Sequence, residues 1–548
     1  MKKLLVPLAI FLVVILLLPA CGKEATTTPS PTPTTSPTQT ATQTATQTST
    51  PTQTATQTST PTPTSTVTQG GTLRFIYPFS PGSTPGWPNE SGEFQRLWME
   101  WVVYEPLIRI DNKAQPTPWL ATGWDWGADN AYVTFTLREG VKFHDGTEFT
   151  SEAVKLEGDL VISTGESNAV TWDRWEIIDD YTVRLYLKEY LNDFWSSVAG
   201  VNMCFFSPTA YNAHQPDGQA YIKENPIGTG PFKFASFEKD VSMKFVRNDN
   251  YWQAGKPYLD GIDFITVKEE LTQVAVLKAG EGDTLALAGS KVLNEMKQAG
   301  FTILSQFGGT DFIMFDTMNA DSIFNDVNIR KAIEYALNKP AMASALGYGY
   351  YIANNQMPPP DNPAYNASLP TRGYDPAMAQ QLLTDAGHPN GIDVTMIVWP
   401  GEDPKHLAIQ QYLGDVGIDV TLEVVDNAKF WNYMMTGWHG MVSTGYAVGT
   451  NFPSWLKAYF PPNSIFDVSV KLPDAILAKI DPAMRESDSV AAKALSDELI
   501  QMVFDDCSFI PVYSNALGYV LSPKVHDSGF EGYSDWSVWD PANIWLSK

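Results

Sequence analysis

"DVTMIVWPGEDPKHLAIQQYLGDVGIDVTLEVV", residues 393–425, decides the fold class of this chain. Its two ends, residues 393–400 and 418–425, are short runs rich in β-branched and aliphatic residues, which are typical of buried strands. Residues 406–417 between them have the length and composition of a helix. A strand, a helix and a second strand in this order form a β-α-β unit. The sequence therefore predicts an α/β fold with mixed sheets.

Two helices with recognisable features precede this unit. Asp375 is expected to cap a helix that starts at Pro376 and that Gly387 stops. Another helix is predicted over residues 328–339, where apolar residues recur at helical spacing. These residues are Ile329, Ala332, Ile333, Ala336 and Leu337. We interpret their stripe as the face that packs on the core.

Residues 131–149 begin with the alternating pattern of a half-buried strand. Its apolar positions are Val133, Phe135 and Leu137. The chain is then expected to return through residues 141–143 to a tight turn at Asp145-Gly146. His144 beside Asp145 has two interpretations, a metal or base pair and a structural place in the turn. We favour the structural interpretation, because Asp-Gly is a strong turn signal.

Motifs of enzymes and metal sites are missing from the sequence. It contains no G-x-S-x-G nucleophile elbow, no H-E-x-x-H zinc site, no C-x-x-C pair and no G-x-x-x-x-G-K-[ST] phosphate loop. The formal net charge of −25 disfavours nucleic acid, because an acidic surface repels phosphate. We therefore predict no enzyme, no catalytic residue, no cofactor, no metal site and no nucleic-acid partner.

Three blocks, in chain order, carry a family resemblance: residues 137–155, 225–267 and 324–339. The middle block contains "GTGPF", "RNDNYW" and "KPYLD". It resembles the signature segment of the extracytoplasmic solute-binding proteins of oligopeptide, dipeptide and nickel ABC importers. The other two blocks are similar to further blocks of that family. Their glycines, proline and aromatic residues fit turn and core roles, so the blocks identify the scaffold rather than the ligand.

The resemblance implies a two-lobed, periplasmic-binding-protein-like (Venus-flytrap) fold with an extra inserted subdomain. The solute-binding module is expected over residues 70–548: lobe I from 70–110, 225–311 and 510–548, the inserted subdomain from 111–224, and lobe II from 312–509. The chain would cross between the lobes near Asp311 and Phe509. A hinge is expected there, since few residues absorb such a rotation.

The first residues predict a membrane tether. Lys2 and Lys3 precede an uncharged, apolar run, which describes a signal peptide over residues 1–20. The tetrad Leu18-Pro19-Ala20-Cys21 resembles the lipobox of bacterial lipoproteins, in which the cysteine, here Cys21, receives a diacylglycerol. The alternative is an uncleaved membrane anchor with an incidental cysteine. The other two cysteines, Cys204 and Cys507, have no spacing pattern, so the sequence leaves open whether they pair.

Residues 21–69 predict a disordered linker. They consist almost wholly of Thr, Pro, Gln, Ser and Ala, and "TQTATQTSTP" occurs twice in tandem over residues 42–61. Such a composition buries too little apolar surface to offset the entropy of ordering it. The linker would let the folded module move above a membrane.

The resemblance also directs attention to one block of lobe II. Peptide-binding relatives place an aspartate there, which pairs with the α-ammonium of the peptide. The corresponding block here is "GYAVGTNFPSWL", residues 445–456, and no Asp or Glu occurs from Met441 to Phe466. A buried ammonium without a counter-charge is costly. We therefore expect the ligand end on this block to be neutral, unless a carboxylate from elsewhere in the chain serves it.

Trp399, Tyr446 and Asn451 are the candidate ligand-binding residues. Trp399 follows a predicted strand, and strand ends in such sheets open on the cleft. Tyr446 and Asn451 belong to the block just described. Flat rings suit sugar faces, and some relatives bind cello-oligosaccharides. A place in the core is the alternative for any single aromatic residue.

We predict a lipid-anchored, extracytoplasmic solute-binding component of an ABC importer. It would act as a monomer at the outer face of the cell membrane, on the periplasmic side where a second membrane is present. It would capture a peptide-sized solute between its lobes and deliver it to the permease subunits. An oligosaccharide or a nickel chelate is the alternative solute. A surface sensor or an enzyme is the alternative function.

Overall fold

The computed structural model describes residues 67–80, 84–88, 97–165, 169–200, 203–401, 403–462, 464–530 and 538–548. The predicted signal peptide, Cys21 and the linker as far as residue 66 lie outside these residues. Within the described ranges, no helix combines the length and the apolar composition that crossing a membrane requires.

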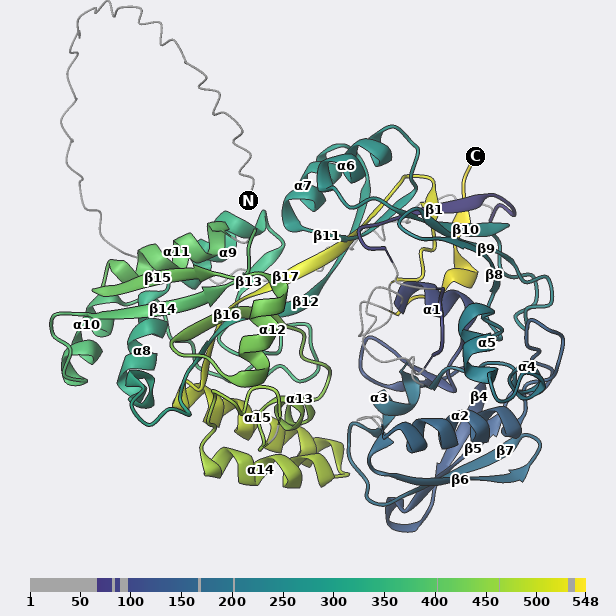
Figure 1. Cartoon of the computed structure of the whole chain (residues 1–548), viewed down its shortest axis with the longest axis horizontal. Helices are drawn as coiled ribbons and strands as arrows, with labels where there is room; N and C mark the ends of the chain where they lie inside the picture. Colours follow the sequence, from purple (N-terminus) through teal and green to yellow (C-terminus); the bar gives the residue numbers. More distant parts are fainter. Residues whose placement is uncertain are drawn as a thin grey trace, which may run out of the picture. The chain divides into compact units, whose positions relative to one another are not determined.

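One sheet of eleven strands forms the framework of the described chain (Figure 1). In spatial order its strands are β15 (Ile418–Val424), β14 (Ile392–Val398), β16 (Met441–Tyr446), β12 (Thr302–Phe315), β17 (Phe509–Leu521), β11 (Thr284–Ala288), β1 (Thr72–Tyr77), β10 (Gly261–Thr266), β9 (Ser242–Arg247) and β8 (Phe232–Glu238), with β13 (Tyr351–Ala353) paired to β17. Strands β14 and β1 have parallel neighbours, whereas the neighbours of β12 and β17 are antiparallel. The predicted α/β fold with mixed pairing is confirmed.

Strands β12 and β17, which we call the crossing pair, connect the two halves of this sheet. They are antiparallel partners over residues 302–314 and 509–521, and their register shifts between Asp311 and Phe312. Strand β12 also pairs with β16, and β17 also pairs with β11. The backbone hydrogen bonding therefore continues from one half into the other.

The β-α-β unit predicted from residues 393–425 is confirmed. Strands β14 and β15 are parallel, and helix α11 (Asp403–Gly414) connects them. Helix α10 (Pro376–Asp385) also begins as predicted, because the Asp375 carboxylate accepts a hydrogen bond from the Met378 backbone N–H. Gly387 follows its end with φ at 89°, a value that favours glycine.

Helix α8 (Val327–Ala336) is shorter than predicted. Its apolar stripe is buried as expected, and Leu337 is buried too, but in extended conformation after the helix. A second helix, α9 (Lys339–Gly347), starts next, and the Asn338 side chain caps it by accepting a hydrogen bond from the Ala341 N–H. Pro340 lacks a backbone N–H and cannot continue α8.

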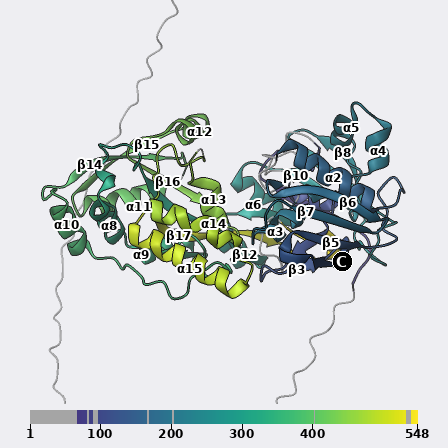
Figure 2. The same ribbon diagram turned by 90° about the horizontal axis from the view of Figure 1, so that it is seen from below.

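A separate antiparallel sheet lies within residues 111–224 (Figure 2). We call these residues the 111–224 region. In spatial order its strands are β4 (Ala121–Trp126), β5 (Tyr132–Leu137), β7 (Thr182–Leu187) and β6 (Trp172–Asp179). Helix α2 (Ser151–Thr164) packs against β6 and β7. The apolar positions of β5 are buried as predicted, but the predicted return through residues 141–143 forms only an isolated bridge from Lys142 to Glu148. Strand β5 pairs with β4 and β7 instead.

The Asp145-Gly146 turn is present, and His144 has a structural place beside it. Asp145 accepts a hydrogen bond from the Thr147 backbone N–H at 3.0 Å. The Nε2 atom of His144 lies 2.9 Å from the carbonyl oxygen of Gly230, and burial lowers its pKa to about 4. The imidazole is therefore neutral near pH 7, where it donates to the turn of the signature segment.

The glycines of this signature turn are required by close packing. A Cβ on Gly228 would overlap the carbonyl oxygen of Val103, and one on Gly230 would lie 2.6 Å from that of Val102. Both carbonyls belong to helix α1 (Leu97–Val103). Any larger residue would push the turn away from α1.

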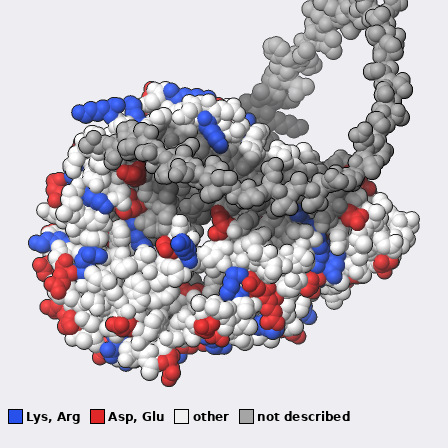
Figure 3. All heavy atoms as spheres, turned by 180° about the vertical axis from the view of Figure 1, so that it is seen from behind, with Lys and Arg blue, Asp and Glu red and all other residues white. Residues whose placement is uncertain are grey.

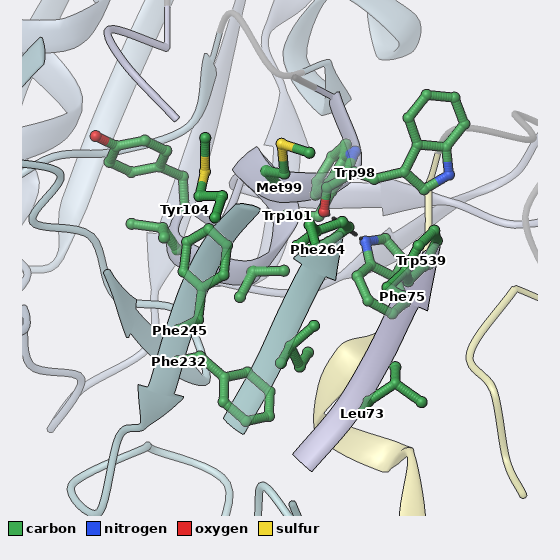
Figure 4. Close-up of a cluster of buried hydrophobic side chains, with 14 of the residues drawn as sticks. Leu73, Phe75, Trp98, Met99, Trp101, Tyr104, Phe232, Phe245, Phe264 and Trp539 are labelled. Atoms are coloured by element: carbon green, nitrogen blue, oxygen red, sulfur yellow. Dashed lines mark hydrogen bonds between the residues drawn. The ribbon is translucent and has the colours of Figure 1, made fainter. Parts of the chain in front are cut away.

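Helix α1 and strands β1, β8, β9 and β10 enclose an aromatic core (Figure 4). The Trp539 indole N–H donates to the carbonyl of Trp98 at 2.9 Å, and its ring lies edge-on to Phe75 with centroids 5.5 Å apart. This core anchors the C-terminal residues against β1.

The other helices are α3 (Phe194–Ala199), α4 (Pro208–Ala213), α5 (Gly218–Glu224), α6 (Glu270–Lys278), α7 (Ser290–Gln298), α12 (Asn427–Thr436), α13 (Phe452–Tyr459), α14 (Asp474–Arg485) and α15 (Ser489–Asp506). The short strands are β2 (Ile108–Ile110), β3 (Pro116–Pro118), β18 (Val525–His526) and β19 (Trp545–Leu546). Cys204 and Cys507 are buried and free, so they do not form a disulfide. The Cys507 thiol instead donates to the Glu334 carboxylate at 3.0 Å.

Candidate functional site

A cavity of about 470 Å³ lies between the 111–224 region and residues 312–509. We call the latter the 312–509 region. This volume falls within the range of small-molecule sites, roughly 300–1,000 Å³. From the 111–224 region the lining includes Lys113, Gln115, Trp124, Tyr190, Asn192 and Trp195. From the 312–509 region it includes Thr450, Asn451, Glu486, Ser489, Lys493 and Ser496.

The first wall of the cavity is aromatic. The ring of Trp195, on helix α3, lies 5.0 Å from that of Trp124 on β4, measured between centroids. The Trp126 ring also packs on this cluster, with its centroid 5.6 Å from that of Trp195 and 5.5 Å from that of Tyr190. Such a cluster offers apolar ring surface to a bound molecule.

The second wall is polar. It contains the N-terminus of α13, where the Asn451 side-chain oxygen accepts a hydrogen bond from the Ser454 N–H at 3.0 Å. It also contains Lys493 on α15, whose ammonium pairs with Asp497 at 2.5 Å. Amide and hydroxyl groups on this wall can donate and accept hydrogen bonds without adding net charge.

Residues 189–196, which we call the contact segment, bring the two walls together. The Asn451 amide donates to the Asn192 side-chain oxygen at 2.6 Å. The Ser454 hydroxyl donates to the Asp193 carboxylate, also at 2.6 Å. Burial raises the pKa of Asp193, and the bond from Ser454 offsets part of this shift.

The three predicted ligand contacts occupy different places. Asn451 lines the cavity, although its side chain is engaged by α13 and Asn192. Trp399 lies just after β14 with its ring on Phe430, at 4.1 Å between centroids. Tyr446 ends β16 among the rings of Phe312, Tyr459 and Phe466, and burial raises its pKa. Neither Trp399 nor Tyr446 is among the described residues that line the cavity, and their contact with a ligand stays a prediction.

A carboxylate does lie beside the block at residues 445–456, and it comes from the crossing pair. Asp311 on β12 is directly opposite Gly445 on β16. Its carboxylate is nearly buried, pairs with the Lys405 ammonium at 2.7 Å and accepts a hydrogen bond from the Asn515 side chain at 2.8 Å. The chain therefore supplies its own ammonium to this carboxylate, whereas a second carboxylate at the block, that of Asp193, accepts a hydrogen bond from Ser454 at 2.6 Å.

Sequence reasoning missed this ion pair, and one signal for it existed. Asp311 directly precedes the apolar run Phe312–Phe315, and a charge beside such a run predicts a buried partner. Nothing in the local sequence identifies Lys405 as that partner, because the two residues come from distant parts of the chain. The neighbouring His406 is buried as well, and its pKa is lowered to about 3.

The cavity offers aromatic ring surface on one wall and hydrogen-bonding groups on the other. Among the described residues, no three His, Cys, Asp or Glu side chains come together in a way that could hold a metal ion. Acidic and basic side chains are interspersed on the face drawn in Figure 3. The prediction that the chain has no catalytic residue stays a prediction.

Comparison with known proteins decides the family. Residues 115–464 match the bacterial extracellular solute-binding proteins, family 5, in the middle part of that family's pattern. The chain belongs to this family. As a family 5 protein it is similar to the glutathione-binding protein GsiB of Pectobacterium atrosepticum, with 26% identity over 450 residues that cover 77% of this chain and 85% of GsiB.

Solved structures of similar proteins agree with the fold of this family 5 chain. The periplasmic binding protein DppA of Helicobacter pylori, in complex with the peptide STSA, is 23% identical with a TM-score of 0.73, covering 88% of this chain and 99% of DppA. NikA of Brucella suis, in complex with Fe(III)-EDTA, is also 23% identical, with a TM-score of 0.78 and coverages of 87% and 100%. The predicted two-lobed, periplasmic-binding-protein-like fold is confirmed.

Proposed function

We propose that this chain is the solute-binding component of an ABC importer and that it captures a peptide-sized solute. The observation that carries the proposal is the cavity between the 111–224 and 312–509 regions, whose walls are aromatic on one side and polar on the other. Its relatives GsiB and DppA bind glutathione and a tetrapeptide. A peptide backbone matches the polar wall, and side chains match the rings.

The proposed division of the module follows the family. Lobe I comprises residues 70–110, 225–311 and 510–548, and lobe II comprises residues 312–509, with the crossing pair as the hinge. The 111–224 region is the subdomain inserted into lobe I, so the wall that it forms belongs to the lobe I side of the cavity. In this division the lobes enclose the solute and release it to the permease subunits without chemical change.

Calorimetry with the purified full-length chain tests solute binding. Glutathione and the peptide Ser-Thr-Ser-Ala are the first probes, and cellobiose and Fe(III)-EDTA represent the alternative solutes. We expect one of the two peptides to bind and to be recovered unchanged. Binding of cellobiose or Fe(III)-EDTA in place of both peptides would replace the peptide class by a sugar or a metal chelate. A modified product would support the enzyme alternative.

We also propose that Cys21 carries the lipid anchor that keeps the protein at the outer face of the membrane. The lipobox-like tetrad before the linker supports this proposal. A thioether-linked diacylglycerol buries CH₂ groups in the bilayer, each contributing about 0.8 kcal/mol. Mass spectrometry of the N-terminal peptide should find an acylated Cys21, and Cys21→Ser should release the protein from membranes. An intact N-terminus that still contains Met1 would contradict the anchor.

A further inference from the structure

The contact segment caps the C-terminus of helix α14, although the segment itself lies outside the 312–509 region. Asn192 donates its backbone N–H to the Met484 carbonyl and its side-chain N–H to the Ala483 carbonyl, both at 2.8 Å. The same amide reaches the Glu486 carbonyl at 3.2 Å. Carbonyls in the last turn of a helix such as α14 lack partners inside the helix. Asn192 satisfies them from a segment almost 300 residues away in the chain.

The next residue contacts the opposite kind of helix end. The Asp193 carboxylate accepts a hydrogen bond from Ser454, in the first turn of α13. Free N–H groups at a helix N-terminus carry partial positive charge and favour an acceptor there, but the burial of Asp193 has the larger effect and raises its pKa. Leu191 packs on the hydrophobic core of the 312–509 region. Three consecutive residues thus fit one apolar surface and two helix ends of opposite polarity.

The same segment continues directly into the aromatic wall. Trp195 follows Asp193 by two residues and lines the cavity together with Asn192 and Asp193. The position of its ring therefore depends on how the contact segment sits on α13 and α14. A shift of this segment would move Trp195 away from the polar wall that faces it.

We propose that the contact segment is part of the solute site, with Asn192 as a positioning residue and Trp195 as a specificity-determining residue. The inference rests on the proposed function and adds the chemistry of the solute. Trp195 and Trp124 bind a flat ring on the solute, such as a tyrosine side chain, while the polar wall binds its amide groups. Asn192 holds this aromatic wall at the right distance from α13 and α15.

Calorimetry with two matched peptides tests the role of Trp195 in the full-length chain. The probes are Ser-Tyr-Ser-Ala and Ser-Thr-Ser-Ala, which differ in one ring. We expect the wild type to bind the tyrosine peptide about tenfold tighter, and Trp195→Ala to reduce this preference to about twofold. Trp431→Ala is the control, because Trp431 is 39% exposed on α12 and is not a cavity residue. It should keep the full preference.

A second pair of variants tests Asn192. Asn192→Asp keeps the shape of the side chain but removes its N–H donor to the Ala483 and Glu486 carbonyls, while the backbone bond to Met484 remains. Asn432→Asp on the exposed face of α12 is its control. We expect Asn192→Asp to weaken both peptides about tenfold while keeping the preference for tyrosine. Hydrogen exchange of residues 186–196 and 480–488 should become faster in this variant alone, with or without peptide.

Three results would overturn the inference. One is equal binding of both peptides by the wild type, and another is an unchanged preference in Trp195→Ala. The third is an Asn192→Asp variant that matches Asn432→Asp in affinity and in hydrogen exchange. Failure of the wild type to bind either peptide would instead overturn the peptide class itself, and the inference with it. The exchange measurement distinguishes these cases, since it needs no ligand.

Discussion

The 312–509 region is attached to the rest of the chain in two different ways. At the crossing pair, the backbones of β12 and β17 are hydrogen bonded over residues 302–314 and 509–521 inside one continuous sheet. At the contact segment, the attachment consists of side-chain and turn hydrogen bonds around Asn192 and Asp193, with an exposed ion pair from Glu189 to Arg485 at 2.8 Å.

This difference separates a permanent connection from one that can open. Breaking the crossing pair would expose backbone N–H and C=O groups of a buried sheet, which amounts to unfolding. The polar groups of the contact segment can exchange their partners for water, and each such bond contributes only about 0.5–1.5 kcal/mol net. A binding protein that admits and releases a solute needs both kinds of connection.

The largest effect is expected at the crossing pair. Lys405→Met should lower the free energy of unfolding by about 3–5 kcal/mol, because it leaves the Asp311 carboxylate buried without its counter-charge. Urea titration measures this loss. The matched control is Lys457→Met, which removes an exposed pair with Asp481 and should cost less than about 1 kcal/mol. Adding Asp311→Asn to Lys405→Met should recover much of the stability. Equal losses in Lys405→Met and Lys457→Met would contradict the importance of the buried pair.

Acid should destabilise the fold near the crossing pair, through His406, and should favour the closed contact segment, through Asp193. The pKa of His406, next to Lys405, is lowered from 6.5 to about 3 in the folded chain, so the unfolded chain binds this proton first. Its contribution to stability is complete above 6.5 and is lost as the pH falls from 6.5 towards 3. At the contact segment, burial raises the pKa of Asp193 above 3.8. The closed contact is therefore favoured below this value and weakened as the pH rises through the raised pKa.

Urea titrations at several pH values and hydrogen exchange of residues 186–196 separate the two effects. The acid-induced loss of stability should shrink in His406→Gln, and an undiminished loss in this variant would contradict the role of His406. Lower protection of the contact segment in acid, after correction for the slower intrinsic exchange of amides at low pH and while the protein is still folded, would contradict the role of Asp193.

Replacing Trp399 and replacing Trp195 should have different effects on stability and on peptide affinity. Trp399→Ala should lower the free energy of unfolding by about 1–3 kcal/mol, because its ring packs on Phe430. Its effect on peptide affinity should stay below about threefold, whereas Trp195→Ala affects affinity through the cavity. Calorimetry and urea titration of both variants decide this. A tenfold loss of affinity in Trp399→Ala would instead support its sequence-based assignment as a ligand contact.

The smallest effect is expected for the exposed ion pair of the contact segment. Arg485→Met removes the pair with Glu189, whose side chains are 52% and 44% exposed. The free energy of unfolding should change by less than about 1 kcal/mol, and peptide affinity should hardly change. A larger effect that disappears in high salt would show that this pair, rather than Asn192, holds the segment in place.

Local pattern was sufficient for several elements and for the resemblance to the family. The β-α-β unit followed from apolar runs of the right length at residues 393–425, and the cap of α10 followed from Asp375 and Pro376. The signature blocks predicted the two-lobed fold, which the comparisons confirmed. Predictions from local pattern were wrong where the pairing of a strand depends on which other strands lie beside it. Residues 141–143 do not form the returning strand, because β5 is already occupied on both edges by β4 and β7.

The sequence by itself determined the β-α-β unit, the start of α10 and the Asp145-Gly146 turn, because spacing and capping act over a few residues. Only the tertiary structure decided the partners of charged and polar side chains. Asp311 meets Lys405, Asn192 meets the end of α14, and Trp195 lines a cavity from the 111–224 region. These contacts join residues far apart in the chain. The physical reason is that a hydrogen bond or an ion pair depends on distance in space, and distance in space is set only when the elements have packed.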